Sequence, residues 1–128
     1  MSAIVVDSSW IIDQMRAGTD FRQRLVPVLR SGQLYNLGVI RAEVLRGVKQ
    51  PRMRDAICDF FDIVPEIPCD AKLWRQVSDL GWSLGRQGKW PPVTDLAIAV
   101  GALRVGATVI TLDSHFQDIP DLRVRSDL

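Results

Sequence analysis

Two apolar runs lie close together near the C-terminus, and an aspartate stands at the edge of each. Asp95 precedes LAIAVGAL, which is long enough for a buried helix, and Asp113 follows ATVITL, a β-branched run typical of a strand. A similar run, AIVV, occupies residues 3–6. Short apolar strands that alternate with helices are typical of a parallel sheet covered on both faces, so the pattern predicts an α/β fold.

Strand-like and helix-like patterns alternate along the rest of the chain. We expect helices at residues 10–15, 20–32, 41–48, 51–64, 70–88 and 94–106. Pro27 lies inside the second of these and favours a kink or two short helices there. We expect strands at residues 3–6, within 33–40, near 62–67, at 107–112 and at 122–126. This order predicts a parallel sheet with helices on both faces, in one domain over residues 1–128.

The composition narrows the classes of function. With 128 residues, 47% of them hydrophobic, the chain can bury a core, and its net charge of +1 provides no broad basic surface. Any contact with nucleic acid must therefore come from a local patch. Cys58 and Cys69 lack the spacing of metal ligands, and with one histidine in the chain a structural zinc site is not expected.

The N-terminal segment MSAIVVDSSW lacks the features of a targeting signal. It has no basic residue, and its four-residue apolar run is too short for a signal peptide. No stretch of about 18 consecutive apolar residues occurs anywhere in the chain. We therefore expect a cytoplasmic protein that does not contact a membrane.

Four acidic residues are predicted to lie near the edge of the parallel sheet at which ligands usually bind. Asp7 directly follows the first strand and Asp113 follows the run ATVITL, so both would emerge at one edge if these strands are neighbours. Asp95 opens a helix that packs on the sheet, and Glu43 borders the apolar stripe of its own helix. Clustered carboxylates favour a hard cation such as Mg²⁺ or Mn²⁺, and such a site supports metal-assisted phosphodiester hydrolysis.

Each of these acids also has an ordinary structural explanation. Asp7 and Asp95 could cap or stabilise the start of a helix, and Asp113 could be a turn residue. Glu43 could pair with Arg41 or Arg46 on the surface. These alternatives stay open for each acid taken alone, and the metal site is favoured because the acids can converge.

The stretch GRQGKWPPVTD, just before Asp95, carries cations and an aromatic ring. Arg86, Lys89 and Trp90 could supply phosphate contacts and a stacking face, although a solvated loop with Trp90 tucked onto the core is the favoured interpretation. Arg41 and Arg46 flank Glu43 and could contact RNA phosphate or an acidic partner. No GxSxG elbow or glycine-rich phosphate loop is present, so the sequence indicates no covalent nucleophile or nucleotide fold.

Together the four acidic motifs resemble those of PIN-domain ribonucleases, in particular the small VapC-type toxins of toxin–antitoxin modules. The motifs are VVDSSWII with Asp7, AEVLRGV with Glu43, TDLAIAVGAL with Asp95, and VITLDSHFQDIPDL with Asp113. The resemblance implies a three-layer α/β/α sandwich around a short parallel sheet, with Mg²⁺ or Mn²⁺ bound by all four acids as catalytic ligands. It further implies an RNA substrate, a homodimer and neutralisation by a cognate antitoxin protein.

The same resemblance implies supporting roles for polar residues beside the ligands. Ser9 and Thr111 match positions that orient the carboxylates, and His115 replaces an aspartate that relatives frequently carry. A phosphoacceptor receiver domain is the weaker alternative, because Asp7 is followed by serines and no lysine follows ATVITL. A catalytically idle PIN-like module that binds RNA or protein also stays open.

Overall fold

The sheet is parallel throughout and short. The computed structural model describes residues 2–128, and within this range the strand order is β2-β1-β3-β4. The pairs β1–β2, β1–β3 and β3–β4 are all parallel, which confirms the predicted fold class. The strands are β1 (Ile4–Val6), β2 (Leu34–Tyr35), β3 (Thr108–Ile110) and β4 (Val124–Arg125).

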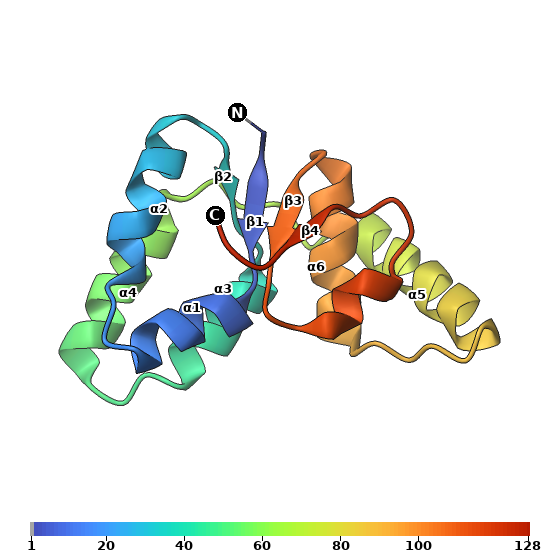
Figure 1. The fold of residues 1–128 in the computed structure, drawn as a ribbon, viewed down its shortest axis with the longest axis horizontal. Helices are drawn as coiled ribbons and strands as arrows, with labels where there is room; N and C mark the ends of the chain where they lie inside the picture. Colours follow the sequence, from blue (N-terminus) through green and yellow to red (C-terminus); the bar gives the residue numbers. More distant parts are fainter. Residues whose placement is uncertain (1) are drawn as a thin grey trace.

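The helices form two layers around this sheet. Figure 1 shows the strands between α1–α4 on the left and α5 and α6 on the right. No helix of residues 2–128 is long and apolar enough to cross a membrane. The helices are α1 (Ser8–Arg16), α2 (Phe21–Arg30), α3 (Gly38–Arg46), α4 (Pro51–Ile63), α5 (Ala71–Arg86) and α6 (Val93–Arg104), with the 3-10 helix η1 at Ser114–Asp118.

Several element boundaries differ from those expected. The helix α2 continues through Pro27, so the alternative of two short helices is wrong: proline keeps a helical φ and removes a single N–H donor. The helices α1 and α3 begin two and three residues earlier than expected, at Ser8 and Gly38. The strand expected near residues 62–67 is reduced to one bridge between Asn36 and Glu66.

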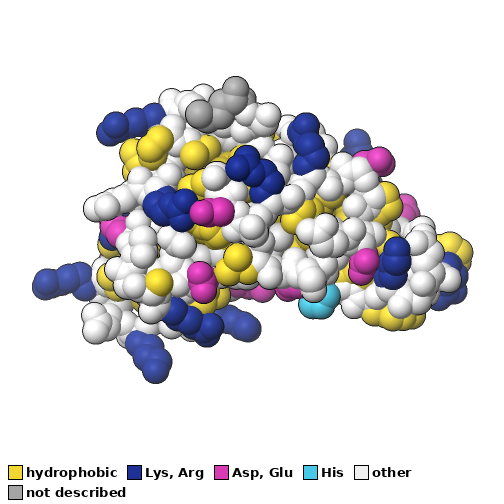
Figure 2. All heavy atoms as spheres, viewed as in Figure 1, with side chains coloured by type: hydrophobic (Ala, Val, Ile, Leu, Met, Phe, Trp, Pro, Cys, Tyr) yellow, Lys and Arg dark blue, Asp and Glu magenta, His cyan; other side chains and the backbone are white. Residues whose placement is uncertain are grey.

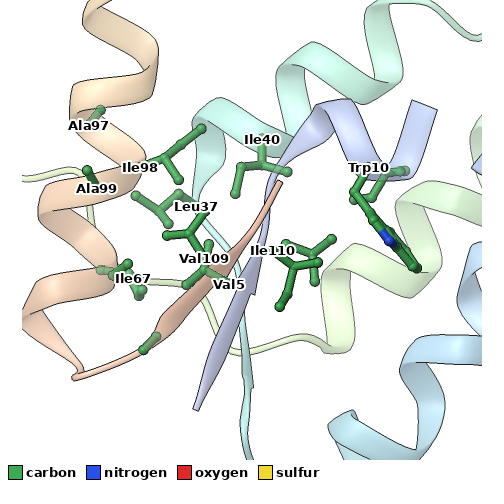
Figure 3. Packing of buried hydrophobic residues seen from close by; sticks show 14 of the residues in the cluster. Val5, Trp10, Leu37, Ile40, Ile67, Ala97, Ile98, Ala99, Val109 and Ile110 are labelled. Carbon is green, nitrogen blue, oxygen red and sulfur yellow. The ribbon is translucent and has the colours of Figure 1, made fainter. Parts of the chain in front are cut away.

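One part of the core lies where α6 packs on the two central strands. Figure 3 shows Val5 of β1 and Val109 of β3 close to Ile98 of α6, with Leu37 beside them. All four side chains are buried. A Cβ at Gly101 of α6 would lie 2.6 Å from a methyl carbon of Leu37, so only glycine permits this approach. The packing fixes the start of α6, and therefore Asp95, relative to the ends of the strands.

Candidate metal centre

Asp7 is held by two hydroxyl groups rather than by the helix that follows it. Its N–H donates to the Ile110 carbonyl of the neighbouring strand at 2.9 Å, which continues the pairing of β1 with β3. The side chain is 3% exposed and forms no capping hydrogen bond in α1. Instead, Asp7 Oδ2 accepts from Ser9 Oγ at 2.7 Å and Thr111 Oγ1 at 2.8 Å. Since both hydroxyls bind Oδ2, Asp7 Oδ1 is the oxygen left for another partner.

The same two hydroxyls also hold the segment after β3. The Asp113 N–H donates to Thr111 Oγ1 at 3.0 Å, and the Leu112 N–H donates to Ser9 Oγ at 3.1 Å. The Asp113 carboxylate accepts from the His115 N–H at 3.0 Å, as expected of a turn residue. The turn role considered for Asp113 is therefore confirmed.

His115 joins the two aspartates of the C-terminal half. Its Nδ1 lies 2.8 Å from Asp113 Oδ1 and 3.2 Å from Asp95 Oδ2. The candidate ligand atoms of Asp95, Asp113 and His115 all lie within 4.8 Å of one another, so these residues could hold a metal ion. His115 was not among the ligands expected from the sequence, although its position two residues after Asp113 was the available signal.

Burial and mutual repulsion change the proton affinity of this group. Burial, followed by the charges of Asp7 and Asp113, raises the pKa of Asp95 to about 6, against the opposing effect of His115. The carboxylate of Asp113 in turn raises the pKa of His115. These shifts show carboxylates close enough to repel one another, and such a group gains stability when it binds a cation.

Glu43 reaches the same region from α3 but stands apart from the compact group. The Ser8 hydroxyl donates to its Oε1 at 3.2 Å. Burial and the charge of Asp7 raise the pKa of Glu43, while Ser8 and Arg46 lower it. Glu43 is thus coupled to Asp7 by charge. Across residues 2–128, however, the group within 4.8 Å contains neither Glu43 nor Asp7.

The basic residues considered from the sequence have different surroundings. Arg41 forms an ion pair with Asp62 at 2.7 Å, so the suggested pairing of Arg41 with Glu43 is wrong. Arg86 lies 4.9 Å above the ring of Trp82. Trp90 is 75% exposed, so the favoured interpretation that it is tucked onto the core is also wrong. Its ring contacts the backbone of α5 and leaves the rest of the indole in solvent.

The short parallel sheet, with acids beyond the ends of its central strands, agrees with what comparison with known protein families shows. The model of the PIN domain family matches residues 4–122, which is most of the chain. The chain belongs to the PIN domain family. The resemblance drawn from the four acidic motifs is therefore confirmed at the level of the family.

Solved structures support the same fold. VapBC from Salmonella typhimurium, bound to DNA, is similar with a TM-score of 0.78 and 20% identity over 98% of both chains. VapBC2 from Rickettsia felis, bound to a promoter DNA fragment, has a TM-score of 0.77 and 20% identity, with 96% of this chain and 97% of that chain covered. VapBC-1 from nontypeable Haemophilus influenzae has a TM-score of 0.74 and 22% identity over 96% of both chains. No curated protein matches the chain.

Proposed function

We propose that this PIN domain is a Mg²⁺- or Mn²⁺-dependent endoribonuclease that hydrolyses RNA phosphodiester bonds as the toxin of a toxin–antitoxin pair. The observation that carries the proposal is the arrangement of Asp7 and Asp113, beyond the ends of β1 and β3, with Asp95 in the first turn of α6. Asp7 and Asp95 are almost fully buried, at 3% and 6% exposed, and the pKa of Asp95 is raised to about 6. Neighbouring buried carboxylates of this kind are suited to a divalent cation.

The donor set fits a hard cation. Carboxylate oxygens of Asp95 and Asp113 lie within one compact group, and Asp7 contributes the oxygen that its hydroxyl partners leave free. We assign these three, with Glu43 on the α3 side, to hold the ion. When bound, Mg²⁺ or Mn²⁺ would act as a Lewis acid on the phosphate and would activate water for attack.

The remaining residues prepare the acids for that role. Ser9 and Thr111 fix the Asp7 carboxylate before any ligand arrives, and Thr111 also fixes the backbone of Asp113. His115, whose pKa is raised by Asp113, brings its Nδ1 within 2.8 Å of Asp113 Oδ1 and 3.2 Å of Asp95 Oδ2. The Asp7 carboxylate is therefore held by neutral hydroxyl donors, whereas Asp95 and Asp113 share a titratable imidazole.

A partner protein and a second copy of the chain belong to the same proposal. The three similar solved structures are VapBC proteins, of which two are bound to DNA. Their shared fold supports a cognate antitoxin that covers the acidic site, and a homodimer of this chain. Sedimentation of the purified chain at tens of micromolar tests the homodimer, which a monomer at that concentration would contradict.

Metal-dependent cleavage tests the central claim. We expect purified protein to cleave single-stranded RNA in Mn²⁺ and to lose this activity in EDTA. Expression of the chain alone should slow growth, and Asp7→Asn at matched protein level should relieve the arrest. RNA binding without cleavage in either metal would instead support the idle binding module, because an intact pocket does not by itself establish turnover.

A further inference from the structure

A group of aromatic and basic side chains lies on the surface near the start of α6. Trp82 and Trp90 are 65% and 75% exposed, although tryptophan normally contributes much of its area to a core or an interface. Arg86 and Lys89 lie between them in the sequence. We call this surface, composed of Trp82, Arg86, Lys89 and Trp90, the tryptophan face.

Each indole of the tryptophan face has a contact with a neighbouring part of α5. A Cβ at Gly85 would meet three ring carbons of Trp90 at 2.9 to 3.3 Å, so the indole lies against the backbone of α5 where no side chain intervenes. The guanidinium of Arg86 lies 4.9 Å from the ring centre of Trp82. Each ring is therefore ordered by a contact on one side, and a large part of its surface is still open to a ligand.

The tryptophan face borders a hollow of about 340 Å³. Its lining includes Trp82, Lys89 and Trp90, together with Val93 and Leu96 of α6. Among the described residues, no acidic side chain lines this hollow. The surface is thus apolar and positively charged, which suits a ligand that carries flat rings and negative charge.

The hollow reaches the first turn of α6, the helix that carries Asp95. Val93 lines the hollow and is the first residue of α6, and Asp95 follows two residues later. Figure 2 shows the only histidine, His115, on the lower edge of the molecule. Hydrophobic and basic side chains gather farther right along this edge, where Figure 1 places the C-terminal end of α5. A strand of nucleic acid at the acids could extend along this edge.

We propose that the tryptophan face binds unpaired bases of a single-stranded RNA beside the cleavage site. The indoles of Trp82 and Trp90 stack on the bases, and Arg86 and Lys89 contact the adjoining phosphates. This inference rests on the proposed ribonuclease function and names the form of its substrate. A second copy of the chain is the less favoured occupant, because two such faces in symmetric contact would bring Arg86 and Lys89 of both copies together.

Binding measured without catalysis tests this assignment. The probe is a fluorescein-labelled single-stranded RNA of mixed sequence, about 12 nucleotides long so that it can span both the acids and the face. Anisotropy is recorded in EDTA for the wild type, Trp82→Ala, Trp90→Ala and Gly85→Ala, with Trp74→Ala as the matched control. Trp74 lines the same hollow from the first turn of α5, far along the helix from Arg86.

We expect Trp82→Ala and Trp90→Ala each to weaken binding about tenfold, since base stacking on an aromatic ring has an effect of this order. Gly85→Ala should weaken binding by a similar factor without removing an aromatic ring, because the added methyl group displaces Trp90. Trp74→Ala should stay within about twofold of the wild type. RNA should also quench tryptophan fluorescence in the wild type, and a perfectly paired duplex of the same length should bind less tightly.

Several results would overturn the inference. Unchanged affinity in Trp82→Ala and Trp90→Ala, absence of RNA binding by the wild type, or an equal loss in Trp74→Ala would each do so. A change from dimer to monomer in Trp82→Ala, with RNA affinity unchanged, would assign the face to a second copy. Wild-type protein that binds RNA in EDTA but does not cleave it in Mn²⁺ would refute the ribonuclease proposal and leave the stacking assignment standing.

Discussion

An aspartate follows each of the two central strands, β1 and β3, but the two carboxylates have different hydrogen-bond partners. Asp7, after β1, is buried and accepts from two neutral hydroxyls. Asp113, beyond β3, is partly exposed and lies 2.8 Å from the titratable nitrogen of His115, which Asp95 shares. A serine or threonine hydroxyl does not titrate near neutral pH, whereas an imidazolium offsets negative charge only while it is protonated. The Asp7 side is thus preorganised, and we expect the Asp95–Asp113 side to respond to pH and to cations.

The largest expected effect is a loss of RNA cleavage when Asp7, on the preorganised side of the site, is changed. Asp7→Asn should lower the rate of RNA cleavage in Mn²⁺ by at least about 100-fold, because Lewis-acid stabilisation of a transition state is worth several kcal/mol. The amide still accepts from a hydroxyl, so folding should be preserved. Initial rates on a labelled RNA measure the effect, with Asp55→Asn as a control on the exposed surface of α4. Comparable rates in Asp7→Asn and wild type would contradict the assignment of Asp7 to the active site.

At the pH-sensitive side, Asp113→Asn should abolish the rise in melting temperature that Mn²⁺ produces. The amide oxygen can still accept from the His115 N–H, so the turn is retained while one negative charge is lost. In EDTA the variant should be more stable than the wild type by on the order of 1 kcal/mol, because repulsion within the pocket is relieved. Thermal unfolding with EDTA and with Mn²⁺ measures both effects. A metal-dependent shift equal to that of the wild type would contradict the assignment of Asp113 as a ligand.

A smaller effect should follow loss of a hydroxyl that supports Asp7. Thr111→Val keeps the shape of the side chain but removes the donor to Asp7 and the acceptor for the Asp113 N–H. Affinity for Mn²⁺ should fall about tenfold, in the range found when groups that orient metal ligands are lost. Titration of metal-dependent cleavage gives the affinity, and Thr111→Ser, which keeps the hydroxyl, should restore it. Equal affinities in Thr111→Val and wild type would show that Asp7 needs no such support.

The smallest effect should be a pH dependence of stability in EDTA. The pKa of Asp95 in the folded chain is raised to about 6, above its ordinary value of 3.8, and the pKa of His115 is also raised. For both groups the folded state binds more protons than the unfolded state, so their stabilising contribution is present at low pH and is lost as pH rises through the folded pKa. The melting temperature should therefore fall by a few degrees from pH 5 to pH 8, and the fall should be shallower in Asp95→Asn. A melting temperature that rises over this interval would contradict the assigned environment of Asp95.

Much of the fold was predictable from local patterns. The β-branched runs AIVV and ATVITL contain β1 and β3, and the nearly continuous apolar pattern before Gly106 marks α6. The helix expected at residues 70–88 begins as α5 at a capping residue, since the Asp70 carboxylate accepts from the Leu73 N–H at 2.8 Å. Boundaries were less accurate, since α3 begins at Gly38 within a segment expected to hold a strand. Hydrophobic periodicity determines which type of element forms, while tertiary contacts determine where it begins and ends.

The sequence by itself placed aspartates at the ends of two buried strands, because strand type and parallel order follow from short-range patterns. Only the tertiary structure decided which partner each carboxylate takes. Thr111 and Asp7 are 104 positions apart and meet because β1 pairs with β3, while His115 reaches Asp95 because η1 folds against α6. The position of the Trp90 ring against the backbone at Gly85 was decided in the same way. Such contacts depend on how segments far apart in the sequence pack together, and no local sequence pattern specifies that packing.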